Sequence, residues 1–249
     1  MSSARERLHL TTTRHPRVVM HQVQSPENLG AAARLMSNFG YTDLTLSCPV
    51  TRDWQSAAPM ARGSPLLKTL RVVETLSEAL TDCVYVCGTT SRTALYGREP
   101  LTPEVASAQI QHHQSRGPVA IVFGGERRGL SDDELAHCQD VVVIPTDEAQ
   151  PSMNLAQAMA VMLYLCRDDV PRTSPASRVP VQGASHQLTE RLQALMQKVL
   201  TQVDFLNTQS PKLILGELVR SLARSDLTER EAQLWLTAFK QLDRCLPKT

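Results

Sequence analysis

Two periods of apolar residues alternate along the first two thirds of the chain. Short apolar runs typical of buried strands occupy residues 17–23, 44–46, 72–73, 83–87, 119–123 and 141–144. Helical spacing fills the intervals, at 28–39, 76–80 and 103–113, in a short helix opened by the capping box of Ser131 and Glu134, and at 155–166. This alternation predicts an α/β fold with a mostly parallel sheet and helices on both faces. Ligands of such sheets bind in loops beyond the carboxyl ends of the strands.

The last of these helices has the clearest pattern. Its apolar residues recur at i, i+4, i+7, i+8 and i+11, which places them on one helix face. They are Leu155, Met159, Met162, Leu163 and Cys166. Ser152 precedes them and is predicted to cap the helix.

The last third of the chain has a different pattern. Residues 169–186 contain three prolines and a glycine among Ser, Thr and Arg, which predicts a linker. Residues 187–249 are purely helical in spacing and predict three helices, the second at 213–222 and the third after a capping box at Thr228. An extension of this size is near the lower limit for folding alone. We therefore expect this small all-α extension to pack on the main domain (17–168) or on a partner subunit.

Charge divides unevenly between these parts. The 249 residues carry 26 Lys and Arg against 25 Asp and Glu, a net charge of +1, which argues weakly against a simple basic nucleic-acid binder. Residues 1–171 hold 15 basic and 18 acidic side chains, whereas residues 172–249 hold 11 basic and 7 acidic ones. A flexible basic tail is expected at 1–16. The basic character is therefore concentrated at the two ends of the chain.

Composition and cysteine usage exclude several classes. An apolar fraction of 42% is too high for a disordered chain, and no run of about 18 apolar residues predicts a membrane span. The N-terminus has no apolar segment typical of a secretory signal. The six cysteines form no CxxC pair, and the seven histidines show no ligand spacing, so neither a metal site nor a disulfide framework is predicted. His137 is expected at the surface, and a reducing cytoplasm fits best.

Three junctions between a strand and a helix carry the candidate chemistry. In the first, Pro26 leads into a helix in which Gly30 and three alanines allow close packing, and Asn28 shares a face with Arg34 only if Asn28 precedes the helix. In the second, Gly124 and Gly125 follow a buried strand, with the spacing of neither a dinucleotide nor a Walker loop. The third runs from Ile144 into the last helix. Taken singly, each junction also fits an ordinary turn or cap.

Together the three junctions resemble the SPOUT-class RNA ribose 2′-O-methyltransferases, the TrmH-like group. The motifs stand in order at 28–34, at 123–126 with Gly129 and Leu130, and at 144–157. The match covers about residues 17–168. Within the group, a linker followed by a short helical extension is most similar to the subfamily that methylates nucleotide 32 of tRNA.

The resemblance implies a sheet whose C-terminal part forms a trefoil knot, and a homodimer that binds S-adenosylmethionine at the subunit interface. The cofactor contacts that carry over by motif are Thr89, Thr90, Ser91, Gly124, Ile144, Pro151, Ser152 and Met153. Pro151 and Gly125 depart from the family pattern. Pro151 has no N–H to offer, and Gly125 is expected to loosen its loop.

The resemblance also implies roles in catalysis. In the family, the arginine corresponding to Arg34 is treated as the residue that activates the ribose hydroxyl. Because an arginine stays protonated, with a pKa above about 12, we hypothesise that Arg34 clamps a neighbouring phosphate and that the proton leaves through Ser152 or water. Asn28, Glu126 and Asn154 are expected to order the loops. No metal is expected, since the sulfonium already carries the leaving-group charge.

The expected activity is therefore S-adenosylmethionine-dependent 2′-O-methylation of a tRNA ribose at nucleotide 32. Methylation of rRNA or of another tRNA position stays open, because the motifs do not read the substrate. A non-catalytic RNA-binding protein is disfavoured by the intact motif residues. A nicotinamide-dependent enzyme is disfavoured by the missing GxGxxG and ribose-binding acid.

Overall fold

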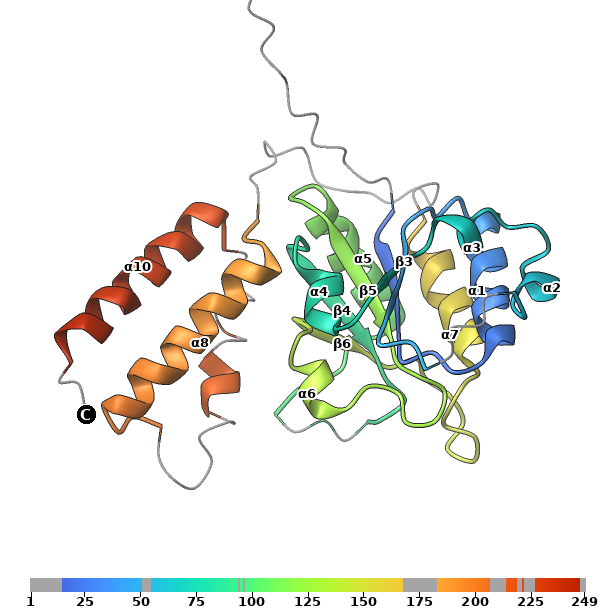
Figure 1. Ribbon diagram of the computed structural model, residues 1–249. Coiled ribbons are helices and arrows are strands. Elements are labelled where there is room, and N and C mark those ends of the chain that lie inside the picture. Colours follow the sequence, from blue (N-terminus) through green and yellow to red (C-terminus); the bar gives the residue numbers. More distant parts are fainter. Residues whose placement is uncertain are drawn as a thin grey trace, which may run out of the picture.

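A six-stranded sheet forms the centre of the computed structural model (Figure 1). The structure describes residues 15–50, 55–93, 95, 97–167, 183–206, 214–218, 221 and 227–246. The strands are β1 (Arg17–His21), β2 (Leu44–Ser47), β3 (Arg71–Val73), β4 (Tyr85–Thr89), β5 (Val119–Phe123) and β6 (Asp140–Val142). Their order is β3-β2-β1-β5-β4-β6, and every pairing is parallel. The predicted α/β class is confirmed, and all carboxyl ends of the strands lie at one edge.

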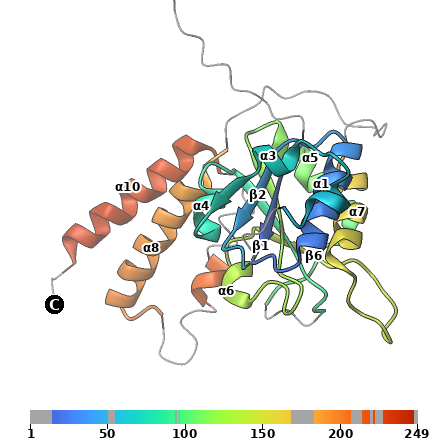
Figure 2. The same cartoon turned by 45° about the vertical axis from the view of Figure 1, so that its right-hand side comes forward.

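Helices cover both faces of this sheet (Figures 1 and 2). They are α1 (Pro26–Asn38), α2 (Ala58–Ala61), α3 (Leu66–Thr69), α4 (Leu76–Leu80), α5 (Pro103–Gln114), α6 (Asp132–Leu135) and α7 (Leu155–Leu165). The helices α1, α5 and α7 share one buried cluster with the sheet, and α4 and α6 share the other. Side chains of β5 alternate between the two clusters, with Ile121 in the first and Val122 in the second, as the pleat of a strand requires. The four-residue helices α2 and α3 were not predicted, because one turn is too short to show a period.

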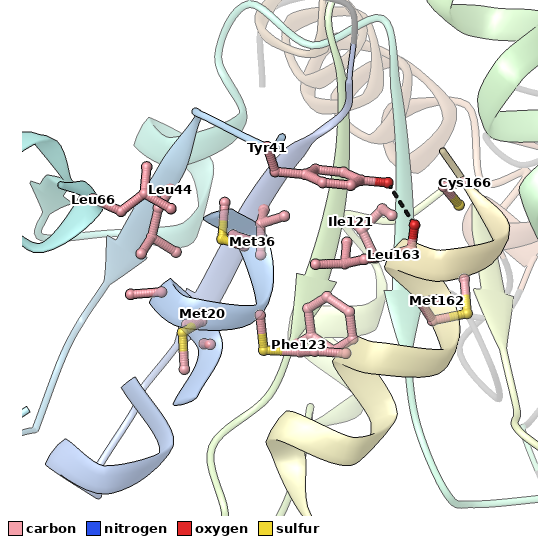
Figure 3. Packing of buried hydrophobic residues seen from close by; sticks show 14 of the residues in the cluster. Met20, Met36, Tyr41, Leu44, Leu66, Ile121, Phe123, Met162, Leu163 and Cys166 are labelled. Carbon is pink, nitrogen blue, oxygen red and sulfur yellow. Dashed lines mark hydrogen bonds between the residues drawn. The ribbon is translucent and has the colours of Figure 1, made fainter. Parts of the chain in front are cut away.

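The first core brings α7 against β1 and β5 (Figure 3). The predicted apolar face of α7 is confirmed, since Met159, Met162 and Leu163 have no exposed surface. The buried hydroxyl of Tyr41 donates a 3.0 Å hydrogen bond to the carbonyl oxygen of Leu163, which satisfies both groups inside the core. This bond ties α7 to the turn between α1 and β2.

Gly30 permits the close packing of α1. A Cβ atom at this position would collide with the carbonyl oxygen of Ala57 and with the side chain of Met60, so only glycine fits beside α2. Helix α1 ends at Asn38 with Phe39 as its C-cap, and Gly40 follows with φ of 76° as the predicted stop. The start of β4 lies two residues later than predicted, because the Cys83 N–H turns back to the Leu80 carbonyl and closes α4.

The helical extension lies beside α4 and α6, on the opposite side of the sheet from α1 and α7 (Figure 1). It contains α8 (His186–Gln202) and α10 (Glu229–Cys245), and residues 214–218 are also helical. The extension has a small core of its own, made of Leu192, Met196, Val199, Leu206, Leu215, Leu236 and Phe239. Residues 1–14 of the predicted tail (1–16), most of the linker and the rest of the second predicted helix lie outside the described residues.

Membrane insertion through a helix finds no support in the described part of the chain. None of its helices combines the length and the apolar character that crossing a bilayer requires.

The trefoil knot that the family resemblance implies stays a prediction.

Candidate active site

A cavity of about 280 Å³ opens beyond the carboxyl ends of β4, β5 and β6, in front of α7. It is lined by Asn28, Thr89, Thr90, Ser91, Phe123, Gly124, Gly125, Glu126, Gly129, Val142, Ile144, Thr146, Pro151, Ser152, Met153, Asn154, Leu155 and Ala158. Two larger cavities lie elsewhere, one beside α8 and one along α5. The smaller cavity is the candidate site, because ligands of parallel sheets bind at this edge and all three motifs meet there.

Glu126 joins the loop after β5 to the start of α1. One carboxylate oxygen accepts hydrogen bonds from the Ser25 N–H and the Asn28 side-chain amide, both at 3.0 Å, and the other accepts from the Gln24 N–H at 2.9 Å. Asn28 in turn accepts a 3.0 Å hydrogen bond from the side-chain amide of Asn154. One residue from each motif therefore takes part in a single chain of hydrogen bonds.

The environment of Glu126 keeps its carboxyl ionised. Partial burial raises the pKa of this group, but the hydrogen bonds from Asn28, Ser25 and Gln24 outweigh burial and bring the pKa below its ordinary value of 4.5. A carboxylate with a lowered pKa is a weak base at neutral pH. Glu126 is thus suited to positioning the loops rather than to accepting a proton from a hydroxyl.

Asn154, and not Ser152, caps α7. The side-chain oxygen of Asn154 accepts hydrogen bonds from the N–H groups of Ala156 (2.9 Å) and Gln157 (3.4 Å). The prediction of a Ser152 cap was wrong by two residues, since either side chain satisfies the capping rule and only the structure shows where the helix begins. Ser152 is left exposed on the cavity wall, with its side chain available to a ligand.

The glycine loop after β5 is closely packed. A Cβ atom on Gly124 would collide with the backbone of Gly129 and Leu130, and one on Gly125 would lie 2.5 Å from the Gln22 carbonyl oxygen. Gly125 is buried, and its carbonyl accepts a 2.9 Å hydrogen bond from the Gly129 N–H. The expectation that Gly125 loosens the loop was wrong, because its missing side chain lets two backbone segments pack together.

Arg34 lies away from the cavity of its own chain. Asn28 is already inside α1, and Arg34, six positions further along the helix, therefore points to another side of it. The Arg34 side chain is exposed, does not line the cavity, and makes no ion pair with the described residues. The structure therefore brings together four of the five predicted catalytic residues, namely Asn28, Glu126, Ser152 and Asn154.

All eight predicted cofactor contacts line the cavity. Glu126 is the one charged residue among the lining residues, which include apolar side chains such as Phe123 and Ile144 and hydroxyl side chains such as Thr89 and Ser152. A flat base, a ribose and a positively charged sulfonium fit such a mixed lining with a single carboxylate. Pro151 already uses its carbonyl oxygen to accept a 2.9 Å hydrogen bond from the Thr146 hydroxyl.

With this geometry in view, a family model described as the SpoU rRNA Methylase family matches residues 15–164. The chain belongs to the SpoU rRNA methylase family. The sequence-based prediction of a methyltransferase is thereby confirmed.

Relatives within the SpoU family cover most of the chain. A protein from Pseudomonas aeruginosa named tRNA (cytidine/uridine/adenosine-2′-O-)-methyltransferase TrmJ is 32% identical, over 88% of this chain and 90% of its own length. A tRNA (cytidine/uridine-2′-O-)-methyltransferase TrmJ from Yersinia enterocolitica is 30% identical over 92% of each chain. The crystal structure of TrmJ from Z. mobilis has a TM-score of 0.77 at 28% identity, over 92% of this chain and 99% of that one.

A buried hydrogen-bonded group, made of His21, Ser47 and Glu134, lies next to the SpoU motif loops and was not predicted from the sequence. His21 is 3% exposed, with Nδ1 2.9 Å from the Ser47 hydroxyl and Nε2 3.0 Å from the Glu134 carboxylate. Glu134 also accepts a 2.6 Å bond from Arg128, which extends from the glycine loop. Burial lowers the pKa of His21 despite the opposing effect of Glu134, so its imidazole is mostly neutral at pH 7.

This Ser–His–Glu group is not a second nucleophile. Ser47 has no exposed surface, so no substrate reaches its hydroxyl. In the sequence, the capping box of Ser131 and Glu134 indicates the start of a helix but does not indicate the contact of Glu134 with His21. The contacts join residues up to 113 positions apart and depend on the sheet order.

Proposed function

We propose that this SpoU-family chain transfers a methyl group from S-adenosylmethionine to a ribose 2′-hydroxyl of tRNA, at nucleotide 32 of the anticodon loop. One observation favours tRNA over rRNA. The similarity to the tRNA methyltransferases named TrmJ covers 88–92% of the chain, beyond the 15–164 that match the family in general, and so includes most of the extension. Methylation of rRNA is the second candidate, which the family description itself names.

S-adenosylmethionine in the 280 Å³ cavity would be held by Thr89, Thr90 and Ser91 at the end of β4, by Gly124 after β5, and by the segment from Ile144 to Met153 before α7. When bound, it supplies an electrophilic methyl group on a sulfonium. The carboxylate of Glu126 lies on the same wall and favours a positive charge there.

Ser152 and Arg34 act on the ribose. Ser152 is exposed at the cavity wall, and its hydroxyl, or a water held by it, accepts the proton that the ribose hydroxyl loses and releases a proton to solvent water. Arg34 stays protonated, and its guanidinium binds the neighbouring phosphate with two parallel hydrogen bonds. Ser152 thus serves proton transfer, and Arg34 serves phosphate binding.

The position of Arg34 supports a homodimer. Since Arg34 does not line the cavity of its own chain, it reaches a ribose only if two chains pair so that Arg34 of one copy faces the cavity of the other. Each site would then combine the SpoU motifs of both copies, in two equivalent sites related by twofold symmetry.

Mixing two inactive variants tests this arrangement. Arg34→Ala removes the anchor, and Ala158→Phe fills the cavity of its own chain. Dimers that contain one copy of each keep one intact site if Arg34 acts across the interface. Unfolding and refolding the two variants together should then restore about one quarter of the wild-type activity. No recovery, with mixed dimers demonstrated by mass spectrometry, would refute the shared site.

The reaction itself is tested by methyl transfer from labelled S-adenosylmethionine to bulk tRNA or rRNA, both taken from a strain that lacks the gene. We expect label in tRNA and not in rRNA. Label in rRNA alone would establish the second candidate, and no label in either RNA would remove the enzyme claim. The proposed place of action is the cytoplasm, where tRNA is available.

A further inference from the structure

Three ligand-type side chains meet at the seam between the methyltransferase domain and the extension. They are His137 in the turn after α6, and His186 and Glu190 on the first turns of α8. Their ligand atoms lie 3.4 Å apart for His137 Nδ1 and His186 Nε2, 3.2 Å for His137 Nδ1 and Glu190 Oε1, and 3.4 Å for His186 Nε2 and Glu190 Oε1. The three atoms form a nearly equilateral triangle.

The size of this triangle matches one face of a tetrahedral zinc site. With zinc–nitrogen and zinc–oxygen distances of about 2.0–2.2 Å, tetrahedral angles put neighbouring ligand atoms about 3.3–3.6 Å apart. We propose that His137, His186 and Glu190 bind one Zn²⁺ ion, with the fourth position open to water, and that the ion fastens α8 to the methyltransferase domain. Two imidazoles and one carboxylate form a donor set that suits zinc.

The ligands are held in place before any ion arrives. His186 and Glu190 are four residues apart, so they lie on one face of α8. The N–H of His186 donates to the Cys83 carbonyl at 2.6 Å, and that of Gln187 donates to the Thr81 carbonyl at 3.2 Å. These bonds fix the start of α8 against the α4–β4 turn.

A further hydrogen bond orients the carboxylate. The Ser77 hydroxyl of α4 donates to Glu190 Oε2 at 2.7 Å, which leaves Oε1 facing the two imidazoles. Metal-binding carboxylates commonly have such an outer partner.

The site is accessible from one side. His186 is buried, but the side chains of His137 and Glu190 are 30% and 34% exposed, and a cavity of about 410 Å³ adjoins all three. An ion can therefore enter from solvent. The sequence predicted no metal site because His137 and His186 are 49 residues apart and show no local spacing.

Zinc titration of the full-length chain, after treatment with a chelator, tests the proposal. Competition with a chromophoric chelator should show one Zn²⁺ per chain at the seam. His137→Asn and Glu190→Gln should each weaken this binding by at least about tenfold, and Ser77→Ala by about 10–100-fold. The matched control is His112→Asn, which changes an exposed histidine of α5 outside the cluster and should leave binding unchanged.

Co²⁺ substitution separates this site from binding by thiols. All six cysteines are free, and Cys245 is exposed. Tetrahedral Co²⁺ at the seam should give visible absorption bands that His137→Asn abolishes, without the near-ultraviolet band of a thiolate ligand. Failure of the wild type to bind one zinc per chain, full retention of binding in both ligand variants, or a thiolate band would each overturn the proposal. Circular dichroism of each variant verifies that it is folded.

Discussion

The methyltransferase domain and the helical extension carry out their parts of the proposed function by different physical means. The domain has a fully parallel sheet between two large cores, and residues 1–171 carry three more acidic than basic side chains. The extension has one small core, and residues 172–249 carry four more basic than acidic side chains. Rigid packing suits the domain to holding a cofactor, and positive charge suits the extension to holding a polyanion. The net charge of the whole chain conceals this division.

A substitution that fills the cavity should have the largest effect of those proposed, and the quantity it should change is the affinity for S-adenosylmethionine. Ala158 lines the cavity, so Ala158→Phe is expected to weaken S-adenosylmethionine binding by about 100-fold or more, equivalent to about 2.7 kcal/mol. Isothermal titration calorimetry measures this. Gln157→Phe is the matched control, because Gln157 is exposed on the same helix and does not line the cavity. Equal weakening in both variants would show that the cavity is not the cofactor site.

Removing positive charges from the extension should weaken the binding of tRNA rather than that of the cofactor. Arg191, Arg230, Lys240 and Arg244 are exposed on α8 and α10, and their joint replacement by Gln should weaken tRNA binding at least about tenfold. The slope of log K against log salt should become shallower by about 0.9 for each phosphate that the variant no longer neutralises. Filter binding at several salt concentrations provides both values, and cofactor affinity should stay unchanged. An unaltered salt slope would break the proposed division between the two regions.

Glu126→Gln should reduce stability in a pH-dependent way. Both carboxylate oxygens now accept hydrogen bonds from backbone N–H groups, whereas the Gln side chain would place an N–H donor against one of those groups. The free energy of unfolding at pH 7 should therefore fall by about 1–2 kcal/mol. Because the folded-state pKa of Glu126 is lowered, its contribution is complete above about pH 4.5 and is lost as the pH falls through the folded-state pKa. Urea unfolding between pH 3 and pH 8 should show the two proteins converging at acidic pH. A constant difference would exclude ionised Glu126 as the cause.

Asn154 offers the smallest effect, and two substitutions separate its two roles. Asn154→Ala removes both the cap of α7 and the hydrogen bond to Asn28, and should cost about 1 kcal/mol of stability. Asn154→Ser keeps a capping oxygen but is too short to reach Asn28. The serine variant should therefore unfold like the wild type in urea while binding the cofactor less tightly. Equal instability of both variants would mean that the link to Asn28, rather than the cap, supports the helix.

Local signals in the sequence predicted most of the fold. The period of Met159, Met162 and Leu163 placed α7, and the capping box at Ser131 placed α6, because both depend on neighbours within about one or two turns. The close packing of α1 followed from Gly30. The one-turn helices α2 and α3 and the strand order do not depend on local spacing, and no periodicity reveals them.

The candidate site was predictable as a set of residues but not as an arrangement. The motifs named four residues that do meet at the cavity, and they also named Arg34, which does not. Arg34 would share a face with Asn28 only if α1 began after Asn28, but α1 begins two residues earlier, at Pro26. Sequence patterns do not locate the start of a helix to within two residues. His21 and the cluster at His137 depend on contacts between distant segments, so the sequence alone could not reveal them.

The proposed function requires this SpoU-family chain to methylate one ribose of tRNA. Its most direct test is to incubate an unmodified tRNA transcript with the protein and S-adenosylmethionine, and to map the product by nuclease digestion and mass spectrometry. We expect a single 2′-O-methyl group at nucleotide 32, absent when the protein carries Ala158→Phe. A methyl group on a base, or a tRNA left unmethylated under conditions in which the protein binds both substrates, would contradict it.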